Sequence, residues 1–219
     1  MSTVANSRPG VVKAPRGPEN ALRRTPVQRR SAERVNRMLD ACAVLLDEIG
    51  YQKLTTTLIA QRAEVAIGSV YQFFGDKRAV VRALDVRYLD EYMSRLENYI
   101  TAEKPQHWSQ FVDAAIDEYI DMHRTVPGFR TLHFGDTVDI HLMDEERSND
   151  DVLTERLLEL IFGHFSFPDQ QVVRLTLTVA VATGDALIKL AFRHDPEGDD
   201  TILNEAKVLL RDYLSRHIA

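Results

Sequence analysis

Apolar side chains at three- and four-residue steps dominate this 219-residue chain after its first 25 residues. Such steps place the apolar residues on one face of a helix, whereas a half-buried strand would need strict alternation. No alternating run of useful length occurs, so the sequence predicts an all-α fold. Helices are expected from between residues 26 and 31 to Gly50, over 58–63, 67–74 and 76–100, and over about 108–125, 127–134, 150–165, 169–193 and 200–217.

Residues that favour helix ends support these bounds. Pro26 suits a first helical position, and Gly50 is a natural C-terminal break. Thr55 and Asp76 are the expected N-caps of the second and fourth helices, because their side-chain oxygens can accept from free backbone N–H groups. Cys42 lies on the apolar stripe of the first helix, so we expect a small core residue and not a reactive thiol.

Charge is distributed unevenly along the chain. The net charge is −6, yet residues 1–30 hold seven basic side chains against one acidic. Residues 31–78 hold six of each kind, and residues 79–219 hold 14 basic against 26 acidic side chains. This asymmetry indicates a polyanionic partner for the N-terminal end alone. Residues 1–25 are expected to form a basic, disordered arm, which either contacts that partner or is a solvated tail.

The remaining composition argues against several classes of protein. A single Cys cannot form an intramolecular disulfide, and no fully apolar run approaches the roughly 18 residues of a membrane helix. Prolines occupy the place of a signal peptide's apolar core. With 44% hydrophobic and 27% charged residues, the chain is expected to be a globular, cytoplasmic protein without membrane association.

The stretch IGSVYQFF at residues 67–74 is too aromatic for an ordinary solvated loop. Two short helices joined by three or four residues, following a longer helix, are the arrangement of a helix-turn-helix. Its second helix enters the DNA major groove and meets base edges. On such a helix Val70 faces the core, whereas Ser69, Gln72 and Phe73 are expected on the outward side.

The side chains of this stretch suit contact with DNA. Gln pairs with adenine and Ser with either base type, while Gly68 lets the backbone approach a phosphate. Tyr71, Thr55 and Lys77 are donors for phosphate oxygens. The expected DNA-binding residues are Thr55, Thr56, Ile67, Gly68, Ser69, Tyr71, Gln72, Phe73 and Lys77, together with Arg29 and Arg30.

The run GYQKLTTTLIAQRAEVAIGSVYQFFGDKRAVVRAL resembles the DNA-binding domain of the TetR family of bacterial regulators. In that family a Gly-Tyr turn, a Thr-rich helix start, Ile-Ala, Ala-x-Val and Gly-(Ser/Thr)-(Val/Leu/Ile)-Tyr-x-(Phe/Tyr)-Phe-x-x-Lys occur in this order, and the match covers about residues 31–84. The resemblance implies a helix-turn-helix domain over 26–78, then a larger helical domain over 79–219 that binds a small ligand and dimerises. It also implies a repressor dimer on palindromic double-stranded operator DNA, released when the ligand binds.

Two positions depart from the family pattern. Glu64 occupies a turn position where the family often has Gly, which predicts mild strain or a different φ. Ile67 stands where a phosphate-binding Lys is common, which removes one positive charge from the interface. Arg29 and Arg30 can restore that attraction by following the backbone or entering a minor groove.

Aromatic and histidine side chains cluster between residues 107 and 141. They either fill an all-α core or line an apolar pocket with a few polar anchors. The family layout places the pocket among these middle helices, so a fairly apolar small-molecule effector is expected. The residues expected to bind it are Trp108, Phe111, His123, Phe129, His133 and Phe134.

The segment 172–192 is apolar on nearly all sides, so it must be buried both in the core and against a partner. Asp185 and Lys189 within it are expected to form a minor helical ion pair. A homodimer is therefore expected through helices at about 169–193 and 200–217, as a two-fold four-helix interface. The last helix would contribute Ile202, Ala206, Leu209, Leu210 and Tyr213.

Two other classes of function remain open. For an enzyme, His133, Asp136, Asp139 and His141 would have to converge on a metal, and on a helix His141 lies well off the face of the others. No Gly-rich phosphate loop or nucleophile elbow occurs, so no catalytic residue, metal or cofactor is predicted. A helical ligand-binding or scaffold protein without operator binding is the other alternative, against which the intact recognition segment argues.

Overall fold

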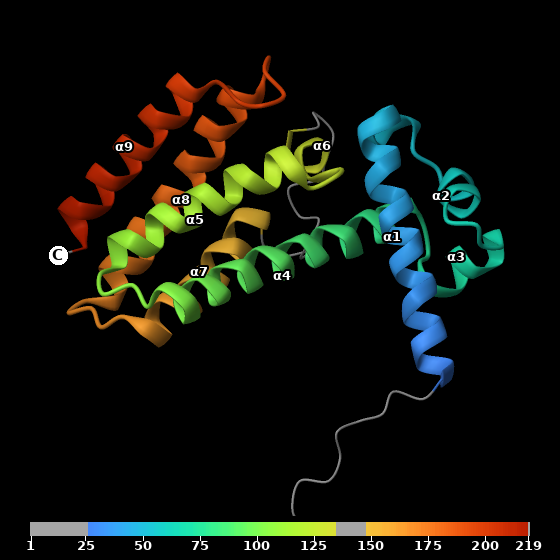
Figure 1. Ribbon diagram of the computed structural model, residues 1–219, viewed down its shortest axis with the longest axis horizontal. Coiled ribbons are helices and arrows are strands. Elements are labelled where there is room, and N and C mark those ends of the chain that lie inside the picture. The colour runs from blue at the N-terminus through green and yellow to red at the C-terminus, as the bar shows by residue number, and fades with distance from the viewer. Residues whose placement is uncertain (1–25, 135–147, 219) are drawn as a thin grey trace, which may run out of the picture.

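The computed structural model describes residues 26–134 and 148–218, with the backbone alone at 26–28, 133 and 134. Every regular element within these ranges is a helix, as predicted. In chain order the helices are α1 (Pro26–Lys53), α2 (Thr56–Arg62), α3 (Ile67–Phe73), α4 (Lys77–Glu103), α5 (Trp108–Thr125), α6 (Phe129–Phe134), α7 (Asn149–His164), α8 (Gln170–Phe192) and α9 (Asp200–His217), as Figure 1 shows.

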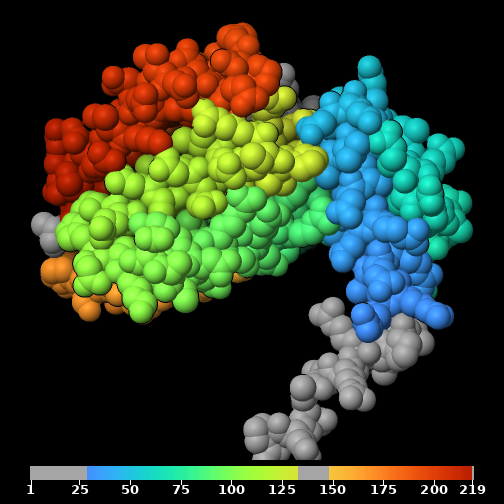
Figure 2. Space-filling model, viewed as in Figure 1, coloured from blue at the N-terminus to red at the C-terminus, as the bar shows by residue number. Residues whose placement is uncertain are grey.

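The helices form two parts that α4 joins (Figure 1). In the first part α2 and α3 pack against each other beside α1, at one end of the molecule. From this end α4 runs into the second part, where it packs against α5 and α7, while α8 and α9 form a helical hairpin. The space-filling view shows the first part, in blue and cyan, as a separate end of an elongated molecule (Figure 2). A change in the second part can therefore reach the first through a continuous helix.

The predicted helix starts are confirmed where a side chain caps them. Thr55 accepts a hydrogen bond from the Leu58 N–H at 3.2 Å, and Asp76 accepts one from the Ala79 N–H at 2.8 Å. Gly50 has a φ of 71° and interrupts α1 as expected, although one further helical turn follows it before Lys53. Caps and breaks of this kind act within one turn, which is why the sequence locates them well.

Two other helix ends differ from expectation. α4 continues three residues beyond residue 100 and stops at Lys104, whose φ of 48° closes the helix before Pro105. α6 begins at Phe129 and not near residue 127, because Gly128 with a φ of 75° forms the turn that precedes it. An added Cβ at Gly128 would lie 2.7 Å from the Ala43 carbonyl oxygen, so this turn and α1 are in direct backbone contact.

The turn between α2 and α3 bears out the expectation for Glu64. Its φ is 53°, a left-handed conformation that costs a non-glycine residue about 1–2 kcal/mol. The turn is closed by the N–H of Val65, which donates to the Ala60 carbonyl at 3.0 Å. Arg62 also binds Glu48 of α1 through two hydrogen bonds of 3.0 and 2.6 Å, which fixes α2 against α1.

The core begins under the helix-turn-helix and continues along α4. Ile59 of α2 and Val70 of α3 are fully buried and belong to one cluster that extends into α5, α7 and α8. Cys42 is also fully buried there, as predicted, and burial raises the pKa of its thiol to about 12. The first part therefore has a packed core that fixes how α3 is presented to solvent.

Candidate DNA-binding face and effector cavity

The rotation of α3 is set by its buried face. Because Val70 is fully buried and Phe74 is 9% exposed, Tyr71 and Gln72 between them point away from the core. Tyr71 and Gln72 are exposed, the former by 57%, and Gly68 at the start of the helix is exposed too. Ile67 is 41% exposed as well. One solvent-facing edge is thus shared by four of the predicted contact positions: Ile67, Gly68, Tyr71 and Gln72.

A polar contact on this edge joins the start of α2 to the second half of α3. The Thr56 hydroxyl lies 3.1 Å from the Tyr71 hydroxyl, across the helix-turn-helix. Thr55 is occupied as the N-cap of α2, so its hydroxyl already accepts the Leu58 N–H. The two hydroxyls of Thr56 and Tyr71 form a paired donor set of the kind that positions a protein on phosphates.

Lys77 makes contacts within the protein, whereas the sequence predicted only a donor for phosphate oxygens. It is half-buried, its Nζ donates to the Tyr51 carbonyl at 3.1 Å, and it lies 4.5 Å from the centre of the Tyr51 ring. The ammonium therefore ties the start of α4 to the end of α1. It retains further donors, since an ammonium carries three.

Phe73 does not lie on the outward side as expected. It is half-buried and packs against the core cluster, and the Arg34 guanidinium carbon lies 5.8 Å from its ring centre. The reason is local, because Phe73 lies three residues after the buried Val70 and therefore shares that face of α3. Ser69 is half-buried as well, whereas Gln72 is exposed.

The N-terminal half of α1 carries basic residues beyond those predicted. Arg29 and Arg30 are exposed, and a depression on this helix is lined by Arg30, Arg34 and Arg37 together with Glu33 and Asn36. Positions 30, 34 and 37 follow helical steps, so the sequence held a signal for one basic face that the prediction overlooked. The proposed arm at residues 1–25 lies outside the described residues.

A cavity of about 90 Å³ lies in the second part between α5, α7, α8 and α9. Its walls are mainly aliphatic, with Leu153 and Leu157 from α7 and Val181 from α8. Among the described lining residues one side chain is charged, Asp185 of α8. A mostly apolar cavity with few polar groups is typical of a small-molecule site.

The predicted effector residues fall in different places. Phe111 lines the cavity, and Phe129 lines a smaller neighbouring one of about 30 Å³ that shares Tyr92 and Tyr119 with it. His123 is buried beside both cavities, with its ring centre 4.7 Å from that of Phe129, and its Nδ1 lies 2.7 Å from the Tyr119 carbonyl oxygen.

Trp108 does not reach the cavity wall. Trp108 is buried at the first turn of α5, where its ring tilts over His107, and it is not among the lining residues. The side chains of His133 and Phe134 lie outside the described residues. The aliphatic walls from α7, α8 and α9 were missed, because their apolar spacing is the same as that of ordinary core residues.

The hypothetical metal group falls largely on undescribed residues: Asp136, Asp139 and His141 lie outside the described ranges, and so does the His133 side chain. In the part of the chain that the structure describes, no group of three or more His, Cys, Asp or Glu residues could hold a metal ion.

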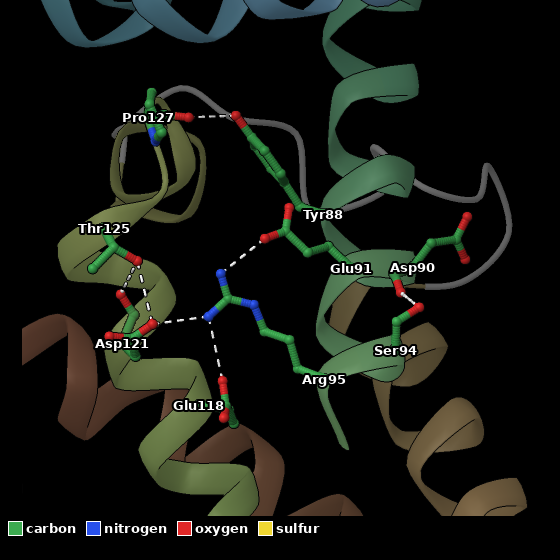
Figure 3. Close-up of polar contacts among 9 residues, drawn as sticks. All are labelled: Tyr88, Asp90, Glu91, Ser94, Arg95, Glu118, Asp121, Thr125 and Pro127. Carbon is green, nitrogen blue, oxygen red and sulfur yellow. Dashed lines mark hydrogen bonds and ion pairs between the residues drawn. The ribbon is translucent and has the colours of Figure 1, made fainter. Parts of the chain in front are cut away.

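Arg95 joins α4 to α5, one of the helices that line the cavity (Figure 3). Its guanidinium binds Glu91 on its own helix at 2.8 Å, and Asp121 and Glu118 on α5 at 2.8 and 3.3 Å. The arginine side chain is 27% exposed, so water screens these ion pairs in part. Figure 3 also shows the Tyr88 hydroxyl of α4 directed at the carbonyl of Pro127, to which it donates a hydrogen bond.

A second connection runs from α1 to α6. The Asp47 carboxylate accepts the Gly128 N–H at 2.7 Å and the Thr131 hydroxyl at 2.9 Å. A residue of the DNA-binding part thereby caps a helix of the second part. With the Tyr88 contact, both α1 and α4 are hydrogen-bonded to the segment that follows α5. The helix α5 itself lines the cavity.

The outer faces of α8 and α9 are unusually apolar. Leu175 and Leu190 of α8 are 66% and 41% exposed, and Val208 and Leu209 of α9 are 52% and 47% exposed. The predicted interface residues separate here. Ala206 and Leu210 are buried inside the chain, Ile202 and Tyr213 are half-buried, and Leu209 is exposed.

Small residues of α8 face inward, not toward a partner. Thr176, Ala180 and Gly184 are buried, and an added Cβ at Gly184 would lie 3.3 Å from Leu210 of α9. Close packing of α8 on α9 therefore explains them. Val172 and Val179, each 40% exposed, continue the outer apolar stripe instead.

By length and composition alone, α8 is also apolar enough to cross a membrane, with a mean hydropathy of 1.6. This corrects the expectation that no segment of the chain is long and apolar enough for a membrane helix. Core helices of globular proteins pass the same test, and α8 packs against both α7 and α9.

The fold and the exposed α3 edge define a helix-turn-helix regulator. Residues 38–84 match the family described as bacterial regulatory proteins, tetR family, and residues 106–218 match the tetracyclin repressor-like C-terminal domain. The chain belongs to the TetR family of DNA-binding transcriptional regulators, which are not enzymes.

Similar proteins of known structure or curated function agree with this assignment. A TetR-family transcriptional regulator from Streptomyces coelicolor is 43% identical, with a TM-score of 0.72 over 84% of this chain and 99% of that one. The fatty acid degradation regulator FadR from Bacillus halodurans shares the fold, at 17% identity and a TM-score of 0.62 over 81% of this chain and 94% of that one. The HTH-type transcriptional repressor KstR from Rhodococcus jostii (strain RHA1) is 31% identical over 98 residues, which are 45% of this chain and 44% of the repressor.

Proposed function

We propose that this regulator is a homodimeric repressor that binds a palindromic operator through α3 and leaves it when a small, fairly apolar effector binds. The observation that carries the proposal is the exposed edge of α3, with Tyr71 and Gln72 turned to solvent above a fully buried Val70. A rigid edge of this kind on a short second helix fits the major groove.

On DNA, the residues of this edge divide between bases and phosphates. Gln72 and Ser69 read base edges, while Thr56, Tyr71 and the backbone at Gly68 contact phosphate oxygens. The other predicted positions act at the edge of the interface. Thr55 and Lys77 hold α2 and α4 in place, and Phe73 supports Arg34. Ile67 contacts the wall of the groove, while Arg29 and Arg30 bind the DNA backbone along α1.

Dimerisation through α8 and α9 completes the site. The exposed stripe of Val172, Leu175, Val179 and Leu190 on α8 adjoins Val208 and Leu209 on α9. A contiguous apolar surface favours burial against a second copy, and a two-fold axis would pair identical faces. Two α3 helices related by that axis would read the two halves of a palindrome.

The cavity between α5 and α8 is the proposed effector site. It supports release because α5 is bonded to α4 through Arg95, and the following segment is bonded to α1 through Asp47. Any effector that shifts α5 therefore acts on both helices that carry the helix-turn-helix. A regulator of bacterial genes works where the chromosome is, which supports a cytoplasmic location.

The decisive experiment is selection of bound fragments from the source genome, followed by fluorescence anisotropy with the selected duplex and a scrambled duplex. We expect enrichment of fragments that share an inverted repeat, with a dimer bound to each. Equal affinity for selected and scrambled duplexes would overturn the proposal and favour the ligand-binding scaffold without operator binding.

A further inference from the structure

The wall of the effector cavity carries one charge in an otherwise apolar lining. Asp185 lies in the middle of α8, and its side chain is 17% exposed. The lining also includes Ile188, Val181 and Ile116, whose side chains offer no hydrogen bond, and the phenol of Tyr119, which lies close enough to be affected by the charge of Asp185. Desolvating a charged or polar group costs free energy unless a partner compensates it, so a carboxylate here favours particular occupants.

Lys189 compensates Asp185 from outside the cavity. Its Nζ lies 2.6 Å from Oδ2 of Asp185, one helical turn further along α8. The lysine side chain is 43% exposed and does not line the cavity. The ammonium thus balances the carboxylate at the rim without placing a positive charge where an effector would lie.

The two tyrosines of the cavity wall do not replace a cation. The Tyr92 hydroxyl donates to the Ala115 carbonyl at 2.8 Å, which uses its proton within the fold. Burial raises the pKa of the Tyr119 hydroxyl well above its ordinary value, and the negative charge of Asp185 adds to the rise. An anionic occupant would therefore meet a carboxylate and neutral phenols, with no cation in the described lining.

We infer that the effector is an apolar molecule with a hydrogen-bond-donating group, an alcohol or an amine, which binds Asp185, and that carboxylates are rejected. The inference rests on the proposed effector cavity. A carboxylate only accepts hydrogen bonds, so it matches an O–H or N–H donor and repels a second carboxylate. Rejection by like charge in a mostly apolar site gives specificity that apolar contacts alone do not supply.

Three probes with one carbon skeleton test this inference: 1-butanol, butylamine and butanoate. They are short because the cavity of about 90 Å³ is smaller than the roughly 150 Å³ engineered cavity that holds benzene. Binding is followed by methyl NMR titration of the full chain at Val181, Ile188 and Leu157. In the wild-type protein, we expect butanol and butylamine to bind at least about tenfold more tightly than butanoate.

Substitution of the carboxylate separates its role from that of the apolar walls. In Asp185→Asn the preference for butylamine and butanol over butanoate should shrink to within about threefold, because the repelling charge is gone. Asp212→Asn is the matched control, since it makes the same change of charge at an exposed position on α9 outside the lining. It should keep the wild-type order of affinities.

Two further variants test where the probes bind and what the Lys189 ammonium contributes. Ala180→Leu fills part of the cavity and should weaken all three probes together, with helicity unchanged by circular dichroism. Lys189→Gln removes the compensating ammonium, so butylamine should gain over butanol. Butanoate binding as tightly as butanol to the wild type, no shift of the lining methyls, or an unchanged order in Asp185→Asn would each overturn the inference.

Operator titrations test the proposed function separately from the assignment of Asp185. Without probes, Asp185→Asn should bind the selected operator as the wild type does, because the residue is remote from α3. A wild-type protein that fails to discriminate operator from scrambled DNA contradicts the proposed function. A wrong order of probe affinities, with operator binding intact, contradicts only the assignment of Asp185.

Discussion

Neighbouring residues of α3 have opposite environments. Val70 is fully buried, Tyr71 is 57% exposed, and Phe73 is covered by Arg34 from α1. The same helix thus contributes to the core, to the solvent-facing edge and to a contact with α1 within four positions. Individual side chains on such a helix have separable roles, which single substitutions can measure.

Gln72→Ala should relax sequence preference at one position in each operator half-site. We expect a loss of about 1–3 kcal/mol on the selected operator and little change on non-specific DNA, because a bidentate amide contact to a base is removed. Anisotropy titrations against operator and scrambled duplexes at two salt concentrations provide the measurement. An equal loss on both duplexes would show that Gln72 contributes general affinity and does not read a base.

Cys42 gives a prediction about pH. Burial raises the pKa of its thiol from 9.0 to about 12, with Arg87 lowering it slightly. Because the folded pKa lies above the unfolded one, the stability is retained below about pH 9 and falls as the pH rises toward 12. Between pH 9 and 10, we expect the free energy of unfolding to fall by about 1 kcal/mol more in the wild type than in Cys42→Ala.

Urea unfolding of both proteins at the two pH values provides this comparison. The difference between wild type and variant isolates the thiol, because every other ionisable group is common to both proteins. Identical pH dependence in the two proteins would contradict the assignment of a buried, protonated thiol.

At the scale of helices, the contacts between α1 and α6 and between α4 and α5 connect the two parts. Asp47 accepts from Gly128 and Thr131, whereas Arg95 spans from α4 to Glu118 and Asp121 (Figure 3). Gly128 is buried and its N–H donates to the Asp47 carboxylate, whereas Arg95 and its partners on α5 lie partly in water. The Asp47 contact is therefore the costlier of the two to break.

Asp47→Ala should lower the free energy of unfolding by about 1.5–3 kcal/mol, because hydrogen bonds to a charged acceptor are lost and a buried donor is left unpaired. Asp40→Ala is the matched control on the same helix. Asp40 is 66% exposed and binds Arg87 at 2.7 Å, so its removal should cost less than about 1 kcal/mol. Urea unfolding at one fixed protein concentration measures both, and equal costs would contradict the capping role of Asp47.

At the scale of the whole molecule, the proposed dimer depends on the outer apolar stripe of α8 and α9. Leu175 is its most exposed member at 66%. Leu175→Glu would bury a charge in the proposed interface, so sedimentation velocity at micromolar concentration should show a monomer near 24.9 kDa. Operator affinity should fall with it, because two linked half-site contacts become one.

Val86→Glu is the control for this prediction, since Val86 is 40% exposed on α4, away from the stripe. It should remain a dimer with wild-type operator affinity. A dimeric Leu175→Glu protein would place the interface elsewhere.

The helices and the helix-turn-helix followed from the sequence because their causes are local. Apolar steps, the caps at Thr55 and Asp76 and the break at Gly50 act within a turn or two of chain. The burial of Cys42 and Val70 followed from the same periodicity. Such features survive any arrangement of the helices, so they needed no tertiary information.

The tertiary structure alone decided which of many similar apolar residues line the cavity and which stay exposed on the outer face. Leu209 is exposed and Leu210 buried, although both lie on the apolar side of the same helix. Lys77 binds a carbonyl 26 residues away, and Asp185 lines a cavity instead of forming only a surface pair. These outcomes depend on how helices distant in sequence pack together, and local periodicity does not encode that packing.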